Sequence, residues 1–425
     1  MDATGNVLVS CAAAALGHWE RHASPTSMKI AIVIEHFNPK RGGAETYTAS
    51  LVERLVAEGH EVHLFAGDWT LEPLGLTMVR VPVKGITGAG RTLSFATEAS
   101  ELVGSGGFDV IHSMARILRL SVFHPHGGVT RASLERSIAS TLSPLGRGLR
   151  RAARWLNTKS DMLLELESII YAQSPLPRIV AVSKMVAADM RRYYDVPDSK
   201  IDVVYNGVDV KRFTPENRRA YRDAVRGELG VGADEVLLLL VAHNYRLKGV
   251  EIFMRVLGAM KQRARPKVKG LVVGGGPEDG IYGRLAAKMG VEERITFREA
   301  VSDIERYYAA ADVYLHPTFY DPMSLVVLEA MASGLPAVTT RYNGATEIMT
   351  DGVQGFVVDD PRGVPQITSA LDKLLDAARR AEMGAAARRL AEEYPLEKNF
   401  AGILEVYKKA VAEGLPAKVE IKRGQ

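Results

Sequence analysis

The sequence predicts an α/β protein built from two doubly wound, Rossmann-like domains that face each other across a cleft. Short apolar runs of strand length alternate with helix-like segments along most of the chain, which is typical of parallel sheets covered by helices. The alternation is interrupted by a polar stretch without periodicity at residues 206–220. The chain has 425 residues, more than one small core accommodates.

The first half begins with a βαβ unit. Residues 28–37 (MKIAIVIEHF) form a β-branched run that predicts a buried parallel strand. We expect this strand to be followed by a glycine turn and a helix with apolar Leu51 and Leu55. The helix is expected to end at Gly59, before a second strand at residues 61–65. Further strands are expected in FDVIHSM (108–114), RLSVFHPHGG (119–128), RIVAVS (178–183, followed by a helix) and IDVVYNGVD (201–209).

The second half repeats the pattern after the polar stretch, so we place a domain boundary there. We expect a first domain at residues 28–206, a second at 207–395, and a helix within 396–425 that packs back on the first domain before a tail. Residues 1–27 are expected to be a disordered extension, unless Met28 is the true start. The second domain's strands are expected in VLLLLVAHNY (236–245), KGLVVGGGPEDG (269–280), RITFREA (294–300), DVYLHPTFYD (312–321) and PAVTT (336–340).

Composition and charge argue against several classes of protein. A net charge of +4 is small for this length and argues against a nucleic-acid binder. Cys11 is the only cysteine, so a disulfide within the chain and a cysteine-rich zinc site are excluded. There is no apolar run of about 18 residues, so a membrane-spanning helix is not expected. These features fit a cytoplasmic enzyme.

A helix with a free amino end is expected within YDPMSLVVLEAMASGLPAV (320–338). Residues 324–333 are rich in helix formers, and Gly334 and Pro336 end the run. The unpaired N–H groups of the first turn, together with the positive end of the helix dipole, suit a phosphate. The groups expected to face the cleft belong to Met323, Ser324 and Leu325.

Two carboxylates flank this expected phosphate site. Asp321 precedes the helix, and Glu329 stands within its apolar run, where an unpaired charge is costly. A nucleoside diphosphate sugar bound there would place its phosphates at the helix end and its ribose hydroxyls near an ionised Glu329. From the residues alone, a structural pair between Glu329 and a buried arginine or tyrosine is an equal alternative.

The carboxylate pair belongs to a larger set of short motifs. Asp321, seven intervening residues and Glu329 are followed by AMASGLPAVTT (330–340) and NGATEI (343–348). This set resembles the E-x7-E region of retaining glycosyltransferases of family 4, which have the two-domain GT-B fold. The resemblance covers roughly residues 28–407 and looks most like the lipopolysaccharide-core glucosyltransferases. The other matching motifs are GGAE (42–45), DVIH (109–112), VAVS (180–183), YNGVDVKRF (205–213), KG (248–249) and LVVGGGP (271–277).

The chain departs from the family pattern at two positions. Asp321 stands where a glutamate is usual, so its contact with a donor sugar would be one methylene shorter. His243 stands where an arginine usually precedes the lysine of the KG motif, and Arg246 is the candidate to supply that guanidinium. The identity of the donor sugar is therefore left open.

The resemblance implies transfer of a hexose from a nucleoside diphosphate sugar, expected to be UDP-linked, to a sugar hydroxyl of a glycan or glycolipid, with retention of configuration. Such a reaction would fit the synthesis of lipopolysaccharide or another cell-surface polysaccharide. Lys248, Arg246 and the helix end would stabilise the charge that develops on the diphosphate; a solvated lysine is the alternative for Lys248. No Asp-x-Asp sequence, which often holds a metal under a diphosphate, occurs in the chain, so neither a metal nor another cofactor is expected.

Two segments of the first domain are expected to complete the site opposite Asp321. Gly42 and Gly43 would let the backbone approach the donor, although an ordinary strand-to-helix turn is the alternative. By resemblance, His126 would contact the sugar or orient the reacting groups. The alternatives are a structural histidine and a metal site shared with His124, which lacks nearby carboxylates.

A basic segment of the first domain, SPLGRGLRRAARWLNTKSDMLL (143–164), predicts contact with a membrane or an acceptor. Its apolar residues recur at helical spacing, and such a helix can lie on an anionic membrane surface. A lipid-linked acceptor would then place the protein peripherally on the inner face of the membrane. The alternatives are a solvated helix and a basic mouth for a phosphorylated acceptor. The residues expected to make the contact are Arg147, Arg150, Arg151, Arg154 and Trp155.

Two other functions fit a two-domain fold of this kind. A nucleotide-sugar 2-epimerase would share the fold but resembles the chain less, because it lacks the carboxylate-bearing helix with the NGVD crossover. A non-catalytic nucleotide-sugar-binding protein would not require an intact Lys248, Glu329 and glycine turn. Release of free nucleoside diphosphate only when an acceptor is present distinguishes a transferase from both.

Overall fold

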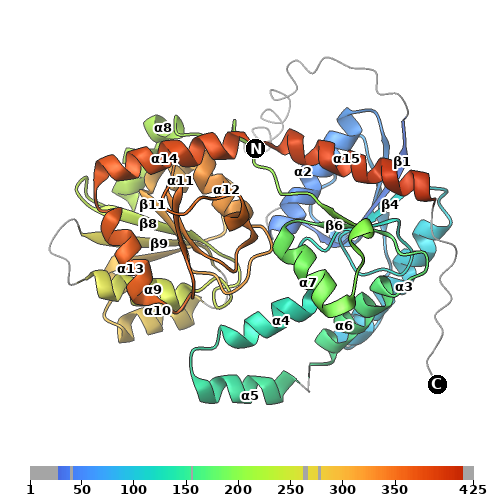
Figure 1. Cartoon of the computed structure of the whole chain (residues 1–425), viewed down its shortest axis with the longest axis horizontal. Helices are drawn as coiled ribbons and strands as arrows, with labels where there is room; N and C mark the ends of the chain where they lie inside the picture. Colours follow the sequence, from blue (N-terminus) through green and yellow to red (C-terminus); the bar gives the residue numbers. More distant parts are fainter. Residues whose placement is uncertain (1–26, 39–41, 155–156, 262–266, 276–278, 415–425) are drawn as a thin grey trace, which may run out of the picture.

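The computed structural model describes residues 27–38, 42–154, 157–261, 267–275 and 279–414. These residues form two parallel sheets, each covered by helices on both faces, and the two units lie side by side (Figure 1). The α/β fold with two Rossmann-like domains is therefore confirmed.

The first sheet has the strand order β3-β2-β1-β4-β5-β6-β7 in the described part of the chain, with every pairing parallel. The order begins as in a Rossmann fold, where the winding reverses between β1 and β4 and ligands bind beyond the carboxyl ends of the strands. The strands are β1 (Lys29–Phe37), β2 (Glu61–Trp69), β3 (Thr77–Arg80), β4 (Val110–Ser113), β5 (Val122–Phe123), β6 (Arg178–Ala181) and β7 (Ile201–Val203).

Alternate residues of β1 enter two different cores, because side chains of a strand point to opposite faces of the sheet. Ile30 and Ile32 join the core under α2 and α15, whereas Ala31 and Val33 join the core under the other helices. All four are fully buried, which explains the continuous apolar run. The helices of this domain are α2 (Gly43–Ala57), α3 (Gly88–Gly104), α4 (Thr130–Ala139), α5 (Pro144–Arg154), α6 (Thr158–Tyr171), α7 (Lys184–Tyr194) and α15 (Leu396–Glu413).

Helix α15 follows the second domain in the sequence but packs on the first sheet. Its Phe400, Ile403 and Tyr407 are buried in the core that contains β1 and α2. The chain crosses between the domains twice at one place, where Val208 pairs with Pro395 in a parallel bridge. Figure 1 shows α14 over the second domain and α15 over the first.

The second sheet has the order β10-β9-β8-β11-β12-β13, again with every described pairing parallel. Helices α9 and α13 cover one face, and α8, α11, α12 and α14 cover the other. The strands are β8 (Val236–Val241), β9 (Val268–Gly275), β10 (Ile295–Glu299), β11 (Val313–His316), β12 (Ala337–Thr340) and β13 (Gly355–Val358). The helices are α8 (Asn217–Glu228), α9 (Val250–Met260), α10 (Asp279–Lys288), α11 (Glu305–Ala310), α12 (Leu325–Ala332), α13 (Val364–Lys373) and α14 (Ala377–Glu392).

Two segments differ from the sequence expectation. The polar stretch 206–220 is not irregular throughout, because α8 begins at Asn217. The first turns of α8 are polar, and its first buried residue is Val225. The segment 119–128 contributes only two residues to a strand, since the chain turns where Gly128 N–H donates to the Pro125 carbonyl. Among the described helices, none is long and apolar enough to cross a membrane.

Candidate active site

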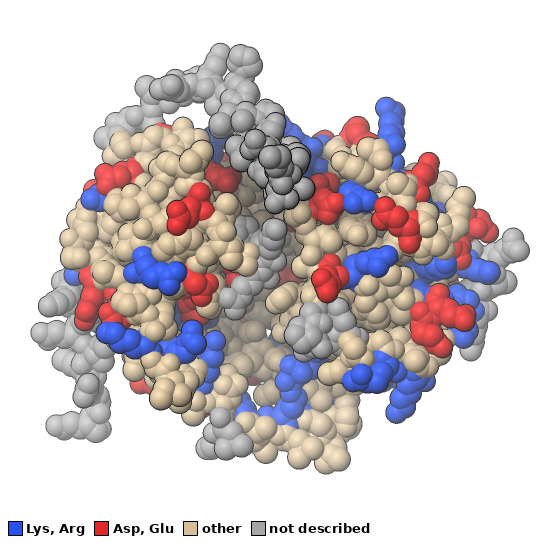
Figure 2. Space-filling model, turned by 180° about the vertical axis from the view of Figure 1, so that it is seen from behind, with Lys and Arg blue, Asp and Glu red and all other residues tan. Residues whose placement is uncertain are grey.

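The carboxyl ends of the strands in both sheets lie at the junction between the two domains. From behind, the surface is hollowed between the two halves (Figure 2). Gly42 is the N-cap of α2, and a Cβ on the next residue, Gly43, would lie 3.2 Å from Leu325 Cδ1 of the second domain. Gly128 has a φ of +78°, and a Cβ there would press against Tyr320. Glycines therefore let two loops of the first domain approach the start of α12 closely.

Lys248 and Asp321 form the central ion pair of this junction. Lys248 Nζ donates to Asp321 Oδ2 at 2.5 Å and lies 3.4 Å from the Tyr320 carbonyl oxygen. Burial alone would raise the pKa of Asp321, but the neighbouring Lys248 and His316 lower it below its usual value. The carboxylate is thus ionised and holds the ammonium at the junction. An ammonium has three donors, so one remains for a further anion.

Arg246 lies two residues before Lys248 in the turn between β8 and α9. It is half-buried, and its buried Nε has no hydrogen-bond partner among the described residues. A buried guanidinium N–H without an acceptor is unfavourable, so this group is suited to a phosphate or carboxylate oxygen that arrives with a ligand.

His126 belongs to the first domain and lies at the junction, near Asp321 of the second domain. Its Nε2 is buried without a partner among the described residues, and its ring centroid lies 4.7 Å from that of Tyr47. Burial lowers the pKa of His126 to about 4, although Asn206 and Asp321 act in the opposite direction. The imidazole is therefore neutral near pH 7. Asn206 also donates from Nδ2 to the Met323 carbonyl at 2.8 Å, which ties the interdomain linker to the turn before α12.

Two further histidines and a tyrosine lie behind His126. His124 Nδ1 is 3.1 Å from His112 Nε2, and His112 Nδ1 is 2.6 Å from Tyr407 Oη of α15. Helix α15 thus contributes to the packing behind the junction. No group of three or more histidine, cysteine or acidic side chains that could hold a metal occurs among the described residues.

The amino end of α12 is only partly free, which corrects the expectation of three free amides. Ser324 is the N-cap, and its N–H donates to Asn343 Oδ1 at 3.3 Å. The same oxygen also accepts from the N–H of Ala345 in the following turn. Met323 and Ser324 are buried, and Leu325 is half-buried. His316 Nδ1 lies 3.4 Å from Ser324 Oγ, beneath the helix start.

Glu329 has a structural partner. Tyr308 Oη donates to its Oε2 at 2.8 Å, so the pair with a buried tyrosine, one of the two alternatives from the sequence, is present. Burial raises the pKa of Glu329, while Tyr308 and Arg212 act in the opposite direction. A carboxylate accepts several hydrogen bonds, and one tyrosine leaves capacity for a ligand hydroxyl.

Glu347, within the motif NGATEI, had no predicted role but links the domains. Its carboxylate accepts from the backbone N–H groups of Lys184 at 2.8 Å and Met185 at 2.6 Å, and from Tyr205 Oη at 3.0 Å. A carboxylate of the second domain thus caps the amino end of α7 in the first domain, where negative charge is favourable.

A cavity of about 640 Å³ lies at the carboxyl ends of the first three strands of the first sheet. His36 Nδ1 and Asp68 Oδ2 are 2.7 Å apart at its wall. Sequence reasoning missed these residues, although His36 lies near the end of the predicted strand 28–37 and Asp68 lies three residues beyond the predicted strand 61–65. The charged and titratable residues that line the cavity are Glu35, His36, Asp68, Arg80, Arg91 and Lys159.

The basic helix α5 stands apart from the domain body in Figure 1. None of its residues is buried, and Leu145 and Leu149 are 75% and 64% exposed. Arg147 and Arg150 are not free, because they donate to backbone carbonyls at the end of α4 and just beyond it. Among the described residues, the side chains of Arg151 and Arg154 form no hydrogen bond or ion pair. Trp155 lies outside the described residues.

Two family models match the chain, and each falls in one domain. The model described as Glycosyltransferase Family 4 matches residues 41–212, and the model described as Glycosyl transferases group 1 matches residues 235–377. The second match spans the whole second sheet.

Curated relatives are similar along most of their length. The D-inositol 3-phosphate glycosyltransferase of Salinispora arenicola (strain CNS-205) is 28% identical over 442 residues, which cover 93% of this chain and 95% of that protein. The lipopolysaccharide glucosyltransferase WaaG of Escherichia coli (strain K12) is 23% identical, with 79% of this chain and 86% of that protein covered.

Solved structures share the two-domain architecture. The crystal structure of WaaG matches with a TM-score of 0.75 and 22% identity, covering 93% of this chain and 100% of that chain. Alr3699/HepE of Anabaena in complex with UDP-glucose matches with a TM-score of 0.66 and 19% identity, covering 90% and 100%. At these identities the likeness shows the fold.

Proposed function

The chain belongs to the family 4 glycosyltransferases of the GT-B fold, and from this premise we propose that it moves a hexose from a UDP-linked sugar to a sugar hydroxyl, with retention of configuration. The observation that carries the proposal is the junction itself. Lys248, the unpartnered Arg246 Nε and the start of α12 gather where two glycine-bearing loops of the other domain approach. The named relatives support the donor, since WaaG is a glucosyltransferase and HepE binds UDP-glucose.

In the proposed reaction the bond between the anomeric carbon and the diphosphate breaks, and charge builds up on the leaving diphosphate. Lys248 and Arg246 would stabilise that charge directly, and Lys248 is already held in place by Asp321 before the reaction begins. Asp321 would keep Lys248 in position beside the donor. The neutral His126 would contact the sugar. The acceptor hydroxyl would attack on the face that the diphosphate leaves, and its proton would pass to the departing diphosphate oxygen.

The acceptor would occupy the first domain. The cavity at the ends of β1, β2 and β3 carries both a His36–Asp68 pair and the cations Arg80, Arg91 and Lys159. Hydroxyls and a phosphate group would both find partners there. A phosphorylated sugar or polyol, like the inositol phosphate in the name of one relative, and a sugar of a lipopolysaccharide core both fit this chemistry.

A panel of nucleotide sugars tests the donor assignment. Thermal unfolding is measured with each compound, and a ligand present at about 100 times its Kd should stabilise the protein by about 2.7 kcal/mol. We expect UDP-sugars to raise Tm more than GDP- or ADP-sugars do. Equal, small shifts for every compound would contradict a nucleotide-sugar site.

Glu329→Ala is expected to weaken donor binding by roughly 10- to 100-fold, the effect of losing hydrogen bonds to a charged group. Folding should change little, because burial of this carboxylate is unfavourable and Tyr308 Oη keeps a second acceptor, the Val326 carbonyl at 3.2 Å. Calorimetric Kd values for the best UDP-sugar and urea unfolding measure the two effects. Tyr308→Phe is the control, since it retains the carboxylate. A destabilised Glu329→Ala protein with an unchanged donor Kd would assign Glu329 a structural role only.

Activity is expected to survive EDTA, because protein cations rather than a metal are proposed to neutralise the diphosphate. Turnover should be the same with EDTA as with added magnesium. Loss of turnover in EDTA that magnesium restores would show that a metal is required.

Helix α5 is proposed to contact an anionic membrane surface on the cytoplasmic side. Each basic residue near such a surface contributes about 1 kcal/mol. We therefore expect the wild type to sediment with anionic vesicles at low salt, whereas Arg151→Glu with Arg154→Glu should not. The control pair, Arg284→Glu with Lys288→Glu, makes the same charge change on α10, where both side chains are exposed. Equal binding by both double variants, or no binding by the wild type, would refute the contact.

A further inference from the structure

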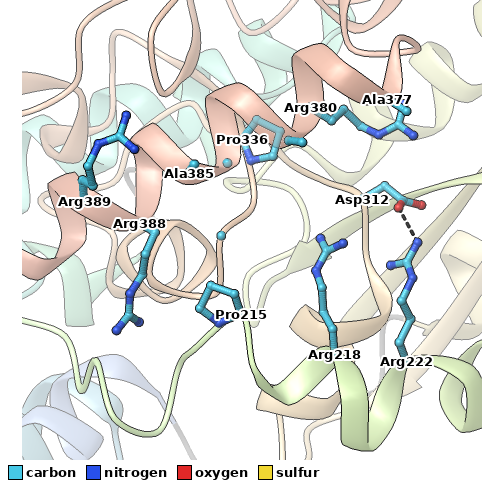
Figure 3. Close-up of a pocket in the computed structure, with 13 residues that line it drawn as sticks. Pro215, Arg218, Arg222, Asp312, Pro336, Ala377, Arg380, Ala385, Arg388 and Arg389 are labelled. Atoms are coloured by element: carbon cyan, nitrogen blue, oxygen red, sulfur yellow. Dashed lines mark hydrogen bonds and ion pairs between the residues drawn. The ribbon is translucent and has the colours of Figure 1, made fainter.

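A second cavity, of about 610 Å³, lies between α8 and α14 (Figure 3). It lies at the ends of the second sheet's strands that are opposite to the junction. Asp312 and Pro336, which line it, directly precede β11 and β12, so it lies at the amino ends of these strands. The Lys248–Asp321 pair lies at the carboxyl ends. Helix α12 runs between the two places, with Leu325 at the junction and Gly334, just beyond its last turn, in the cavity wall.

The cavity wall carries a strong excess of positive charge. Its lining includes a single carboxylate, Asp312, which is already shared between Arg222 at 2.6 Å and the neighbouring Arg226 at 2.9 Å. No acidic side chain therefore remains in the lining to neutralise the other cations. The arginines that line it are Arg218, Arg222, Arg380, Arg388 and Arg389.

Three of these arginines form no ion pair within the described residues: Arg218, Arg380 and the exposed Arg389. Arg218 donates only to the Ala311 carbonyl at 3.2 Å, and Arg380 donates to the carbonyls of Leu374 and Leu375 at 2.7 and 2.9 Å. Figure 3 shows Arg218 rising from α8 toward the space beneath α14, and Arg380 on α14 above it. Burial and the nearby Arg222 and Arg380 lower the pKa of Arg218. This like-charge crowding would be relieved by a bound anion.

The other lining arginines have structural partners or lie further out. Arg388 donates to the Ala332 carbonyl at 2.8 Å, where it stabilises the last turn of α12, and pairs with Glu392. Between the arginines the cavity is lined by the backbone of Gly334 and Gly384. These glycines lie so close together that a Cβ on Gly384 would collide with the Gly334 carbonyl. The volume falls in the range of about 300–1,000 Å³ that small-molecule sites occupy.

We propose that this cavity is a binding site for a small phosphate-bearing anion, held by Arg218 and Arg380 and separate from the site of sugar transfer. A guanidinium presents two parallel N–H groups that match two phosphate oxygens, and both arginines have N–H groups left after their carbonyl contacts. The site lies beyond the end of α12, so a phosphate ester bound there would not occupy the junction.

Calorimetry with inorganic pyrophosphate tests the site in the full chain. The proposed donor site would also bind this probe, so every protein carries Lys248→Ala to weaken that site. The test pair is Arg218→Gln with Arg380→Gln. The control pair is Arg219→Gln with Arg379→Gln, which removes the same charge from adjacent, exposed positions outside the cavity lining. Unfolding curves without ligand establish that each protein is folded at the temperature of the titration.

We expect pyrophosphate to bind the Lys248→Ala protein and the control pair with the same Kd, and the test pair at least about tenfold more weakly. Equal weakening in both pairs would show general attraction by positive charge, and absence of binding to the Lys248→Ala protein would show that no second anion site exists. Either result overturns the proposal. Neither depends on whether the junction transfers sugar, because donor turnover is measured separately on the wild type.

Discussion

Replacing Lys248 by alanine is expected to lower kcat/KM for sugar transfer by about 100- to 1,000-fold, the effect of removing one preorganised group that stabilises developing negative charge. Lys248 donates to Asp321 at 2.5 Å and retains a donor for the diphosphate. Its charge is therefore already in place when the leaving group becomes more negative. The measurement is steady-state release of nucleoside diphosphate with a saturating acceptor.

The same substitution also leaves Asp321 as a buried carboxylate without its cation, and this effect must be separated from catalysis. The double variant Lys248→Ala with Asp321→Asn removes the unpaired charge. If Lys248 acts on the diphosphate, the double variant regains stability but not activity. Lys288→Ala, an exposed lysine of α10, is the control for loss of a positive charge. Near-normal turnover of Lys248→Ala would refute its assignment.

The protein is expected to lose stability steeply between pH 6.5 and pH 5, because four histidines around the junction stay neutral when folded. Burial lowers the pKa of His112 and His316 to about 3 and of His126 to about 4, and it lowers that of His124 well below its usual value. The unfolded chain binds these protons near pH 6.5, so stability is present above that pH and is lost as pH falls toward the folded values.

Each such histidine removes roughly 1.4 kcal/mol per pH unit in this window, and domains have only about 5–15 kcal/mol in total. Burial also raises the pKa of three carboxyl groups, Glu329, Glu53 and Asp189, which act in the opposite direction, but the usual pKa of a carboxyl group lies below this window. The measurement is the free energy of unfolding in urea from pH 7.5 to 5. His112→Asn should reduce the slope by about one proton. Stability that is flat from pH 7 to pH 5 would contradict this account.

The sequence was sufficient to predict the fold class, because continuous apolar runs such as residues 28–37 leave few alternatives to a buried parallel strand. The helix ends were also close: α12 covers Leu325–Ala332, and the expected range 324–333 adds only the capping Ser324 and Ser333. Such features depend on local patterns of apolar, glycine and capping residues, which a single sequence displays directly.

Contacts between distant side chains could not be predicted. Lys248 and Asp321 are 73 positions apart, and Tyr308 and Glu329 are 21 apart, so no spacing rule connects them. Ser324 was expected to have a free amide because Asn343, which accepts from it, comes from a later turn. Residue type indicated that Glu329 needed a partner, but not that Tyr308 would be that partner.

The contacts of the basic helix α5 could not be predicted from the sequence either. Its composition was visible in the sequence, but Arg147 and Arg150 turn back to carbonyls at and beyond the end of α4, which helical spacing alone does not reveal. The exposure of Leu145 and Leu149 is equally a property of the folded chain. The structure therefore narrows the proposed membrane contact to Arg151 and Arg154.

Acceptor-dependent turnover tests the proposed sugar transfer most directly. The purified protein is incubated with the UDP-sugar that binds best, with and without a panel of sugar, polyol-phosphate and lipopolysaccharide-core acceptors, and free UDP is quantified together with the linkage of the product. We expect UDP release that depends on one acceptor class and is abolished by Lys248→Ala with Asp321→Asn, and a product with the anomeric configuration of the donor. Release of UDP at the same rate without any acceptor, or binding of the donor with no turnover in any mixture, would contradict the proposed sugar transfer.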